Sequence, residues 1–141
     1  MEGFSLLVQK HYRHQRFRII KEKERKNKMP FIDSKITVPV SPEKRESIKS
    51  QFGEAVGIFH KPESYLMVGF EDNYDLYMGG AKVEKGAFVS VNLYGNASSD
   101  ACNEMTGKIC SIFEKELGIP GDKVYISYQG YKDWGWNGRN F

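Results

Sequence analysis

The chain has 141 residues and a mass of 16.2 kDa, which is the size of a single domain. Hydrophobic residues make up 40% and charged residues 28% of the sequence, which is typical of a folded soluble domain and excludes a disordered chain. No apolar run reaches the roughly 18 residues of a membrane span, and the two cysteines are too few for a disulfide-dense scaffold, so both of these protein classes are excluded.

The first segment of the chain, residues 1–28, carries its positive charge. It contains nine Lys and Arg against three Glu, whereas residues 29–141 contain twelve against fifteen acidic residues. The net charge of +3 is therefore the sum of +6 in the first segment (nine minus three) and −3 in the rest of the chain (twelve minus fifteen), which is mildly acidic. The only apolar run of this segment, Phe4–Val8, is interrupted by Ser5 and is too short for a signal peptide.

Four interpretations of residues 1–28 stay open. The segment is a disordered extension, an untranslated stretch, a basic tail for nucleic acid or an acidic membrane, or an Arg-rich targeting helix. The codons of Glu24, Arg25 and Lys26 can form a purine block containing AGGA, like a bacterial ribosome-binding site, and Met29 follows shortly after. We therefore expect the segment to be disordered or untranslated, and we predict no nucleic-acid partner and no membrane partner.

From Met29 onward the pattern is strand, helix, strand. Phe31–Val38 is rich in Ile, Val and Thr and predicts a strand. Ser41 as N-cap and Pro42 as first helical residue predict a helix start. Apolar residues then recur at helical spacing and predict one buried face, made of Ile48, Phe52, Ala55, Val56 and Phe59. The predicted helix ends at Lys61-Pro62, and Tyr65–Phe70 predicts a second strand.

The second half of the chain repeats this pattern. Phe88–Tyr94 alternates as a strand does, and Ser98 is the predicted N-cap of a second helix. The buried face predicted for that helix consists of Ala101, Met105, Ile109, Ile112, Phe113 and Leu117. Gly118 and Pro120 are predicted to end the helix, and Val124–Tyr128 is the predicted second strand of this unit.

Two glycine-containing stretches are predicted to be turns. Gly79-Gly80 directly follows Leu76–Met78 and is predicted to be a turn. Gly135–Gly138 is predicted to be a second turn near the end of the chain. Neither stretch has the pattern of a phosphate-binding loop, and no metal-ligand spacing or nucleophilic serine arrangement appears. We therefore predict no cofactor and no metal site.

The two β-α-β units predict the fold class. A right-handed crossover makes the two strands of each unit parallel, and two helices on one face of a shared four-stranded sheet form a two-layer α+β sandwich. The strands also carry apolar residues on their other face, which a single chain of this size has no further element to cover. We therefore expect oligomerisation.

Seven short stretches resemble one known family, that of macrophage migration inhibitory factor and D-dopachrome tautomerase in the tautomerase superfamily. They run in family order across residues 29–141, and the resemblance does not extend to residues 1–28. The stretches are Met29–Ile32, Thr37–Pro39, Lys61–Tyr65, Met78–Gly80, Leu93–Gly95, Val124–Tyr128 and Trp134–Gly138.

The resemblance implies both an assembly and an activity. The family fold is a duplicated β-α-β sandwich, assembled as a homotrimer whose sheets form a barrel-like wall around a central channel. The family activity is keto–enol tautomerisation of aromatic 2-oxo acids such as phenylpyruvate, and isomerisation of dopachrome compounds. The family's catalytic base is an amino-terminal proline, which matches Pro30 here once Met29 is removed.

The resemblance also assigns the remaining site residues. Lys61 matches the cation that lowers the pKa of the prolyl amine and holds the substrate carboxylate. Tyr94 matches a position whose backbone amide binds that carboxylate. Tyr125 and Ser127 match positions reached from the neighbouring subunit, where Ser127 stands in place of an amide side chain. Trp134 replaces a smaller apolar residue near the pocket mouth and either narrows the site or stacks on an aromatic substrate.

The main alternative is a catalytically silent, cytokine-like protein of the same fold that binds a host receptor. It follows if translation begins at Met1, because the nitrogen of an internal Pro30 has no basic lone pair. The absence of a recognisable leader and the two unpaired cysteines predict a cytoplasmic protein. The resemblance adds leaderless release to the extracellular space as a second expectation.

Overall fold

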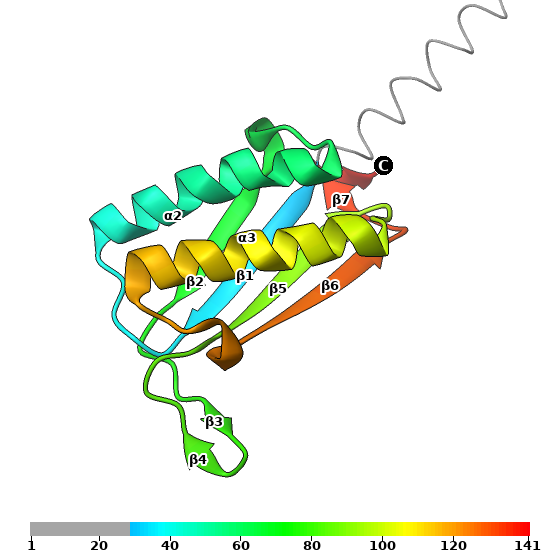
Figure 1. The fold of residues 1–141 in the computed structure, drawn as a ribbon. Helices are drawn as coiled ribbons and strands as arrows, with labels where there is room; N and C mark the ends of the chain where they lie inside the picture. Colours follow the sequence, from blue (N-terminus) through cyan, green and yellow to red (C-terminus); the bar gives the residue numbers. More distant parts are fainter. Residues whose placement is uncertain (1–28) are drawn as a thin grey trace, which may run out of the picture.

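The computed structural model describes residues 29–141, and the predictions for residues 1–28 lie outside the described part. Two helices lie side by side across one face of a four-stranded sheet (Figure 1). The helices are α2 (Pro42–Ala55) and α3 (Ser99–Leu117), and the sheet strands are β1 (Pro30–Ile36), β2 (Met67–Glu71), β5 (Ala87–Tyr94) and β6 (Val124–Tyr131). The α+β sandwich predicted from the sequence is confirmed.

The sheet has the order β2-β1-β5-β6. The pairs β1–β2 and β5–β6 are parallel, as the two crossovers require, and the two units meet through the antiparallel pair β1–β5. The register places Pro30 opposite Leu93 and Ile36 opposite Ala87. The start of β1 and the end of β5 therefore lie at the same end of the sheet.

The core lies between the helices and the sheet. Both predicted caps are present, because the Ser41 hydroxyl accepts from the Lys44 amide and the Ser98 hydroxyl accepts from the Ala101 amide. The sheet contributes alternate residues from each central strand. The largest fully buried side chains include Ile32, Ile36, Ile48, Phe52, Val89, Val91, Leu93, Met105, Ile109, Phe113 and Ile119.

The observed strand bounds differ slightly from the predicted ones, for local reasons. β1 ends at Ile36 because the Thr37 amide and hydroxyl donate to carbonyls of the loop before β5 instead of to a strand. β2 begins at Met67 because Glu63–Tyr65 forms a 3-10 turn after Pro62. A matching 3-10 turn (Gly121–Lys123) follows Pro120 and precedes β6, so the internal repeat extends to these turns.

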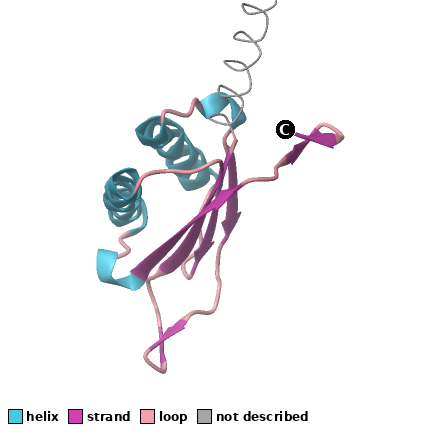
Figure 2. Cartoon of the chain, turned by 90° about the vertical axis from the view of Figure 1, so that its right-hand side faces the viewer, coloured by secondary structure: helices cyan, strands magenta, loops and turns pink. Residues whose placement is uncertain are grey.

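Two short hairpins project beyond the sheet. One consists of β3 (Tyr77–Met78) and β4 (Ala81–Lys82), whose turn is Gly79-Gly80 as predicted. The other consists of β7 (Gly135–Trp136) and β8 (Arg139–Asn140) near the C-terminus. Seen along the sheet, both helices lie on one side and the other face carries no helix (Figure 2). We call that second surface the helix-free face.

Candidate functional site

Pro30 is the first residue of β1 and is buried. Its strand partner across the antiparallel pair is Leu93, so it lies next to the end of β5. The nitrogen of Pro30 is joined to Met29 in a peptide bond and is therefore an amide in the 141-residue chain. An amide nitrogen has no basic lone pair, so this position becomes a base only when the chain begins at Pro30.

Lys61 is a buried lysine, and the residue as a whole is 4% exposed. A 3-10 turn (Val56–Phe59) follows α2, and His60 then adopts a left-handed conformation with φ 58°, which turns the chain back. The Lys61 amide donates to the Val56 carbonyl at 3.2 Å, and its Nζ donates to the Tyr94 carbonyl at 3.4 Å. Burial lowers the pKa of Lys61, because an ammonium loses hydration there.

The backbone of Tyr94 has polar contacts on both sides. Its carbonyl accepts from Lys61, and its amide donates to the Met29 carbonyl at 3.1 Å. The next amide, that of Gly95, donates to the Tyr131 carbonyl at 2.9 Å, which continues the sheet to its end. Three sequence-predicted site residues, Pro30, Lys61 and Tyr94, are thus together at one end of the sheet.

Six aromatic side chains cover this same end, and we call them the aromatic cluster: Tyr65, Tyr94, Tyr131, Trp134, Trp136 and Phe141. The Tyr94 ring lies 5.6 Å from that of Phe141 and 6.4 Å from that of Trp134, between ring centroids. The predicted site residue Trp134 is half-buried, and its ring contacts with Tyr94 and Tyr131 place it at this end of the sheet.

Four members of the aromatic cluster were not predicted as site residues: Tyr65, Tyr131, Trp136 and Phe141. The Trp136 ring lies 5.9 Å from that of Phe141 and 6.2 Å from that of Tyr65. A ring of the C-terminal hairpin therefore contacts Tyr65 in the 3-10 turn before β2, while the hairpin itself projects away from the sheet (Figure 2). Spacing along the chain carries no sign of this, although aromatic residues at the very end of the sequence are a compositional signal.

Tyr125 and Ser127 lie in β6, away from the end of the sheet that carries Pro30. Both are exposed and lie on the helix-free face of β6, where Tyr125 is opposite Phe88 and Ser127 is opposite Ser90. Pro30, by contrast, is aligned through Leu93 with Gly130 of the same strand. At roughly 3.3 Å per strand residue, Tyr125 is about 16 Å along β6 from that position. A single chain does not bring Tyr125 to Pro30.

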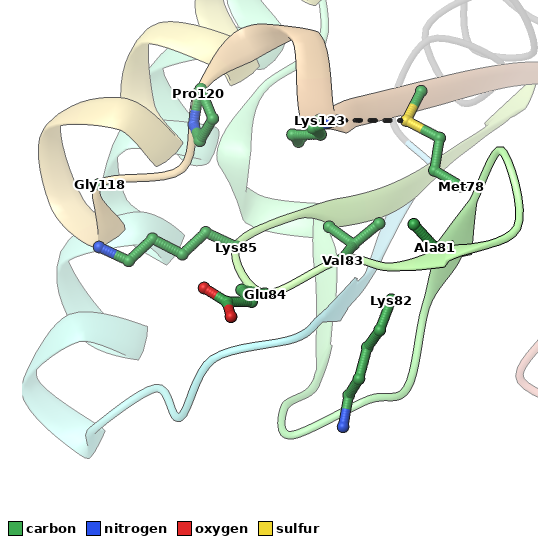
Figure 3. A pocket seen from close by; sticks show the side chains of 9 residues that line it. All are labelled: Met78, Ala81, Lys82, Val83, Glu84, Lys85, Gly118, Pro120 and Lys123. Atoms are coloured by element: carbon green, nitrogen blue, oxygen red, sulfur yellow. Dashed lines mark hydrogen bonds between the residues drawn. The ribbon is translucent and has the colours of Figure 1, made fainter.

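A separate cavity of about 460 Å³ lies at the opposite end of the sheet (Figure 3). It is formed between the β3–β4 hairpin and the connection from α3 to β6. Its lining includes Met78, Val83, Pro120 and three lysines, of which Lys82 also pairs with Asp75 at 3.9 Å. This cavity is distinct from the end of the sheet that carries Pro30 and Lys61.

Within residues 29–141, no three His, Cys, Asp or Glu side chains gather closely enough to hold a metal ion. In the same part of the chain, none of the helices combines the length and apolar character that crossing a membrane requires. Cys102 and Cys110 are free and half-buried on α3, and burial raises the pKa of both thiols.

Comparisons with known proteins agree with this fold. The family described as Macrophage migration inhibitory factor (MIF) matches residues 29–141. A macrophage migration inhibitory factor homolog of Trichuris trichiura is 27% identical over 115 residues, covering 80% of this chain and 100% of its own.

Two solved structures of this type are also similar to the chain. A macrophage migration inhibitory factor of Leishmania major is 30% identical with a TM-score of 0.76, covering 81% of this chain and 98% of its own. A homologue from Prochlorococcus marinus is 28% identical with a TM-score of 0.67, covering 79% and 98%. Since the family match extends from the start of β1 to the last residue, the chain belongs to the macrophage migration inhibitory factor family, within the tautomerase superfamily.

Proposed function

We propose that this protein is a keto–enol tautomerase for aromatic 2-oxo acids of the phenylpyruvate type, with dopachrome-type compounds as further substrates. The observation that carries the proposal is the buried ammonium of Lys61, which is 3.4 Å from the Tyr94 carbonyl at the end of the sheet where Pro30 begins β1. Charged lysines are rarely buried without a function, since burial costs hydration free energy.

Tautomerisation needs a base near neutral pKa and a group that stabilises the developing enolate. The amine of an amino-terminal Pro30 is the proposed base, and an unperturbed terminal amine has a pKa of about 8. The neighbouring Lys61 ammonium lowers that pKa further, because two positive charges repel each other. Pro30 then removes a proton from carbon, and the same ammonium holds the substrate carboxylate.

The aromatic cluster supports an aromatic substrate. The Tyr94 and Trp134 rings lie 6.4 Å apart at the end of the sheet where Pro30 begins β1, and aromatic rings of this kind stack on a phenyl group. The proposed carboxylate donors are Lys61 and the Tyr94 amide, and the Lys61 ammonium contacts the backbone of Tyr94, which is a member of the cluster. This arrangement suits a ligand with an aromatic ring at one end and a carboxylate at the other.

The proposed enzyme is a homotrimer with sites between subunits. Tyr125 is 61% exposed on the helix-free face, and Met67 on the same face is 67% exposed. Because Tyr125 and Ser127 lie far along β6 from their own chain's Pro30, they contribute to a site only when a second copy presents them. We propose that Tyr125 supplies a hydroxyl there and that Ser127 supplies a weaker donor than an amide side chain.

The test uses a chain that begins at Pro30, verified by intact mass. We expect it to convert the enol of phenylpyruvate to the keto form, followed by ultraviolet absorbance, and to sediment as a trimer. A chain of correct mass and trimeric state without turnover would contradict the proposed activity.

If the mature chain retains Met29, the Pro30 nitrogen is an amide, and the alternative function of a catalytically silent binding protein is favoured. Such a chain would have the fold without the base, and would act by binding a protein such as a host receptor. The two functions are separated by the intact mass of the protein made from its own gene. A chain beginning at Pro30 supports the enzyme, and one beginning at Met1 supports the silent binding protein.

A further inference from the structure

The side chain of Asn92 in β5 contacts both neighbouring strands on the helix-free face. Asn92 is opposite Gln129 of β6 in the strand register, and Tyr131 is two residues further along β6 on the same face. Such diagonal neighbours are about 7–8 Å apart, which a long side chain can reach. The Tyr131 hydroxyl accordingly donates a hydrogen bond of 3.1 Å to Asn92 Oδ1.

The nitrogen of the same side-chain amide contacts β1. Asn92 Nδ2 donates to the carbonyl of Phe31 at 3.5 Å, and Phe31 directly follows Pro30. Because a backbone carbonyl can only accept, the amide nitrogen faces Phe31 and the amide oxygen faces Tyr131. The two contacts together therefore give the Asn92 amide one orientation.

The ring of Tyr131 in turn contacts Trp134. The two ring centroids are 5.8 Å apart and the ring planes are inclined at 65°, which is an edge-to-face arrangement. Tyr131 is 41% exposed, so burial restricts its ring in part, and the hydrogen bond to Asn92 adds a second restraint. A chain of contacts thus connects Asn92 through Tyr131 to the Trp134 ring.

We propose that Asn92 and Tyr131 are positioning residues that hold the Trp134 ring where the aryl group of a substrate stacks, so that the site selects aromatic over aliphatic carboxylates. The inference rests on the proposed function, since it concerns the ring-binding part of the same site. The proposed carboxylate contact of Lys61 lies outside this chain of contacts. Loss of the Tyr131 hydroxyl should therefore weaken binding of the aryl group and leave binding of the carboxylate unchanged.

The first test measures the affinity of the protein produced from its own gene for two carboxylates, 3-phenylpropanoate with an aryl ring and hexanoate without one. In Tyr131→Phe, which keeps the ring and loses the hydroxyl, we expect the Kd of 3-phenylpropanoate to rise about three- to tenfold, the net effect of one hydrogen bond. The Kd of hexanoate should not change. The matched control is Tyr77→Phe, which removes an exposed hydroxyl from the β3–β4 hairpin and should change neither Kd. An equal rise for both carboxylates, or no rise for 3-phenylpropanoate, overturns the inference.

A double-mutant cycle tests whether Asn92 and Tyr131 act as a pair. Asn92→Ala breaks the same hydrogen bond as Tyr131→Phe, so the two effects on 3-phenylpropanoate binding should not multiply. We expect the Kd of the double variant to equal that of Asn92→Ala alone. A Kd that rises by the product of the two single effects would show that the residues act independently, which overturns the inference.

The position of the Trp134 ring is measured by fluorine nuclear magnetic resonance of protein labelled with 5-fluorotryptophan. The chain has two tryptophans, so the Trp136 resonance is the internal reference, and loss of a resonance in Trp134→Phe assigns the other. We expect the Trp134 resonance to shift in Tyr131→Phe while the Trp136 resonance stays in place. An unchanged Trp134 resonance contradicts the positioning role.

These measurements do not depend on catalysis. If Tyr131→Phe shifts the Trp134 resonance and weakens 3-phenylpropanoate binding in a protein that does not turn over phenylpyruvate, the proposed function fails and the positioning role stands. If the protein turns over phenylpyruvate while Tyr131→Phe changes neither the resonance nor the affinity, the function stands and the inference about Asn92 and Tyr131 fails.

Discussion

Lys61 donates a hydrogen bond of 3.4 Å from its ammonium nitrogen to the carbonyl oxygen of Tyr94, across the boundary between the two β-α-β units. Lys61 follows the helix of the first unit, and Tyr94 ends the first strand of the second. Pro30 is placed beside Tyr94 by the pairing of β1 with β5. The contact between the two units therefore puts a buried cation at the end of the sheet where the proposed base lies.

Replacing Pro30 tests the proposed base. In a chain that begins at residue 30, we expect Pro30→Gly to lower kcat/KM for phenylpyruvate by about 100-fold or more, which is the size of a general-base contribution. Thermal unfolding monitored by circular dichroism serves as the control, because a folded variant shows that the loss is chemical. Unchanged turnover would remove Pro30 from the mechanism.

Replacing Lys61 tests its effect on the proposed base. A neighbouring cation lowers the pKa of the prolyl amine, so its removal should raise that pKa. In Lys61→Met we therefore expect the acidic limb of the pH profile of kcat/KM to move to higher pH, together with a higher KM from loss of the carboxylate contact. Lys61→Arg keeps the charge and should keep the limb near its original pH. A limb that moves equally in both variants would contradict the electrostatic role.

Ser34 has a buried hydroxyl with no hydrogen-bond partner among the described residues. It is fully buried on the helix-facing side of β1. Since an unsatisfied buried hydroxyl costs about 1–3 kcal/mol, we expect Ser34→Ala to raise the free energy of unfolding by about 1 kcal/mol. The matched control is Ser90→Ala in β5, at a half-buried position, which should change stability by less than about 0.5 kcal/mol. A less stable Ser34→Ala would show that the hydroxyl has a partner.

Replacing each of two glycines by alanine should change the free energy of unfolding in opposite directions. A Cβ at Gly130 would collide with the Gly95 carbonyl oxygen, so Gly130→Ala should cost about 1–3 kcal/mol. A Cβ at Gly107, inside α3, meets nothing within 4 Å, so Gly107→Ala should stabilise the protein by about 0.5–1 kcal/mol. Chemical denaturation measures the change in unfolding free energy for both variants. If Gly130→Ala were stabilising like Gly107→Ala, the close approach of β6 to Gly95 would be refuted.

Glu116 connects the two helices and should make stability depend on pH. Its carboxylate accepts from Lys44 Nζ at 3.2 Å, from Gln51 Nε2 at 3.0 Å and from Ser47 Oγ at 3.0 Å. Hydrogen bonds from Lys44, Gln51 and Ser47, in that order, lower the pKa of Glu116. A lowered carboxyl pKa stabilises the fold above the ordinary value of 4.5, and the contribution is lost as the pH falls through the folded-state pKa.

The measurement is the unfolding free energy of the parent chain and of Glu116→Gln at neutral and at acid pH. We expect the parent to be the more stable at neutral pH and the difference to shrink in acid, where Glu116 is protonated. Glu114→Gln, at an exposed position of the same helix, is the control and should leave the profile unchanged. A difference that is constant with pH would show that the charge of Glu116 plays no part.

Local residue patterns were enough to predict the helices, the strands and the fold class. Ser41 with Pro42 and Ser98 mark the two helix starts because a hydroxyl cap satisfies amides of its own first turn. The core faces of both helices follow from apolar spacing, and Gly79-Gly80 forms a turn at positive φ. All these features depend on residues close together in the chain, so a linear pattern contains them. The resemblance to the family then correctly identified the chain's family.

Which residues meet at the end of the sheet could be read only from the folded chain. The pairing of β1 with β5 places Pro30 beside Tyr94, and the C-terminal segment stacks Phe141 on Tyr94 and Trp136 on Phe141. The structure also placed Tyr125 and Ser127 away from their own chain's Pro30. The contact of the Met29 carbonyl with the Tyr94 amide had no sequence signal, because backbone groups are the same in every residue. Such contacts depend on strand register, which is fixed by burial across the whole sheet and not by neighbours along the chain.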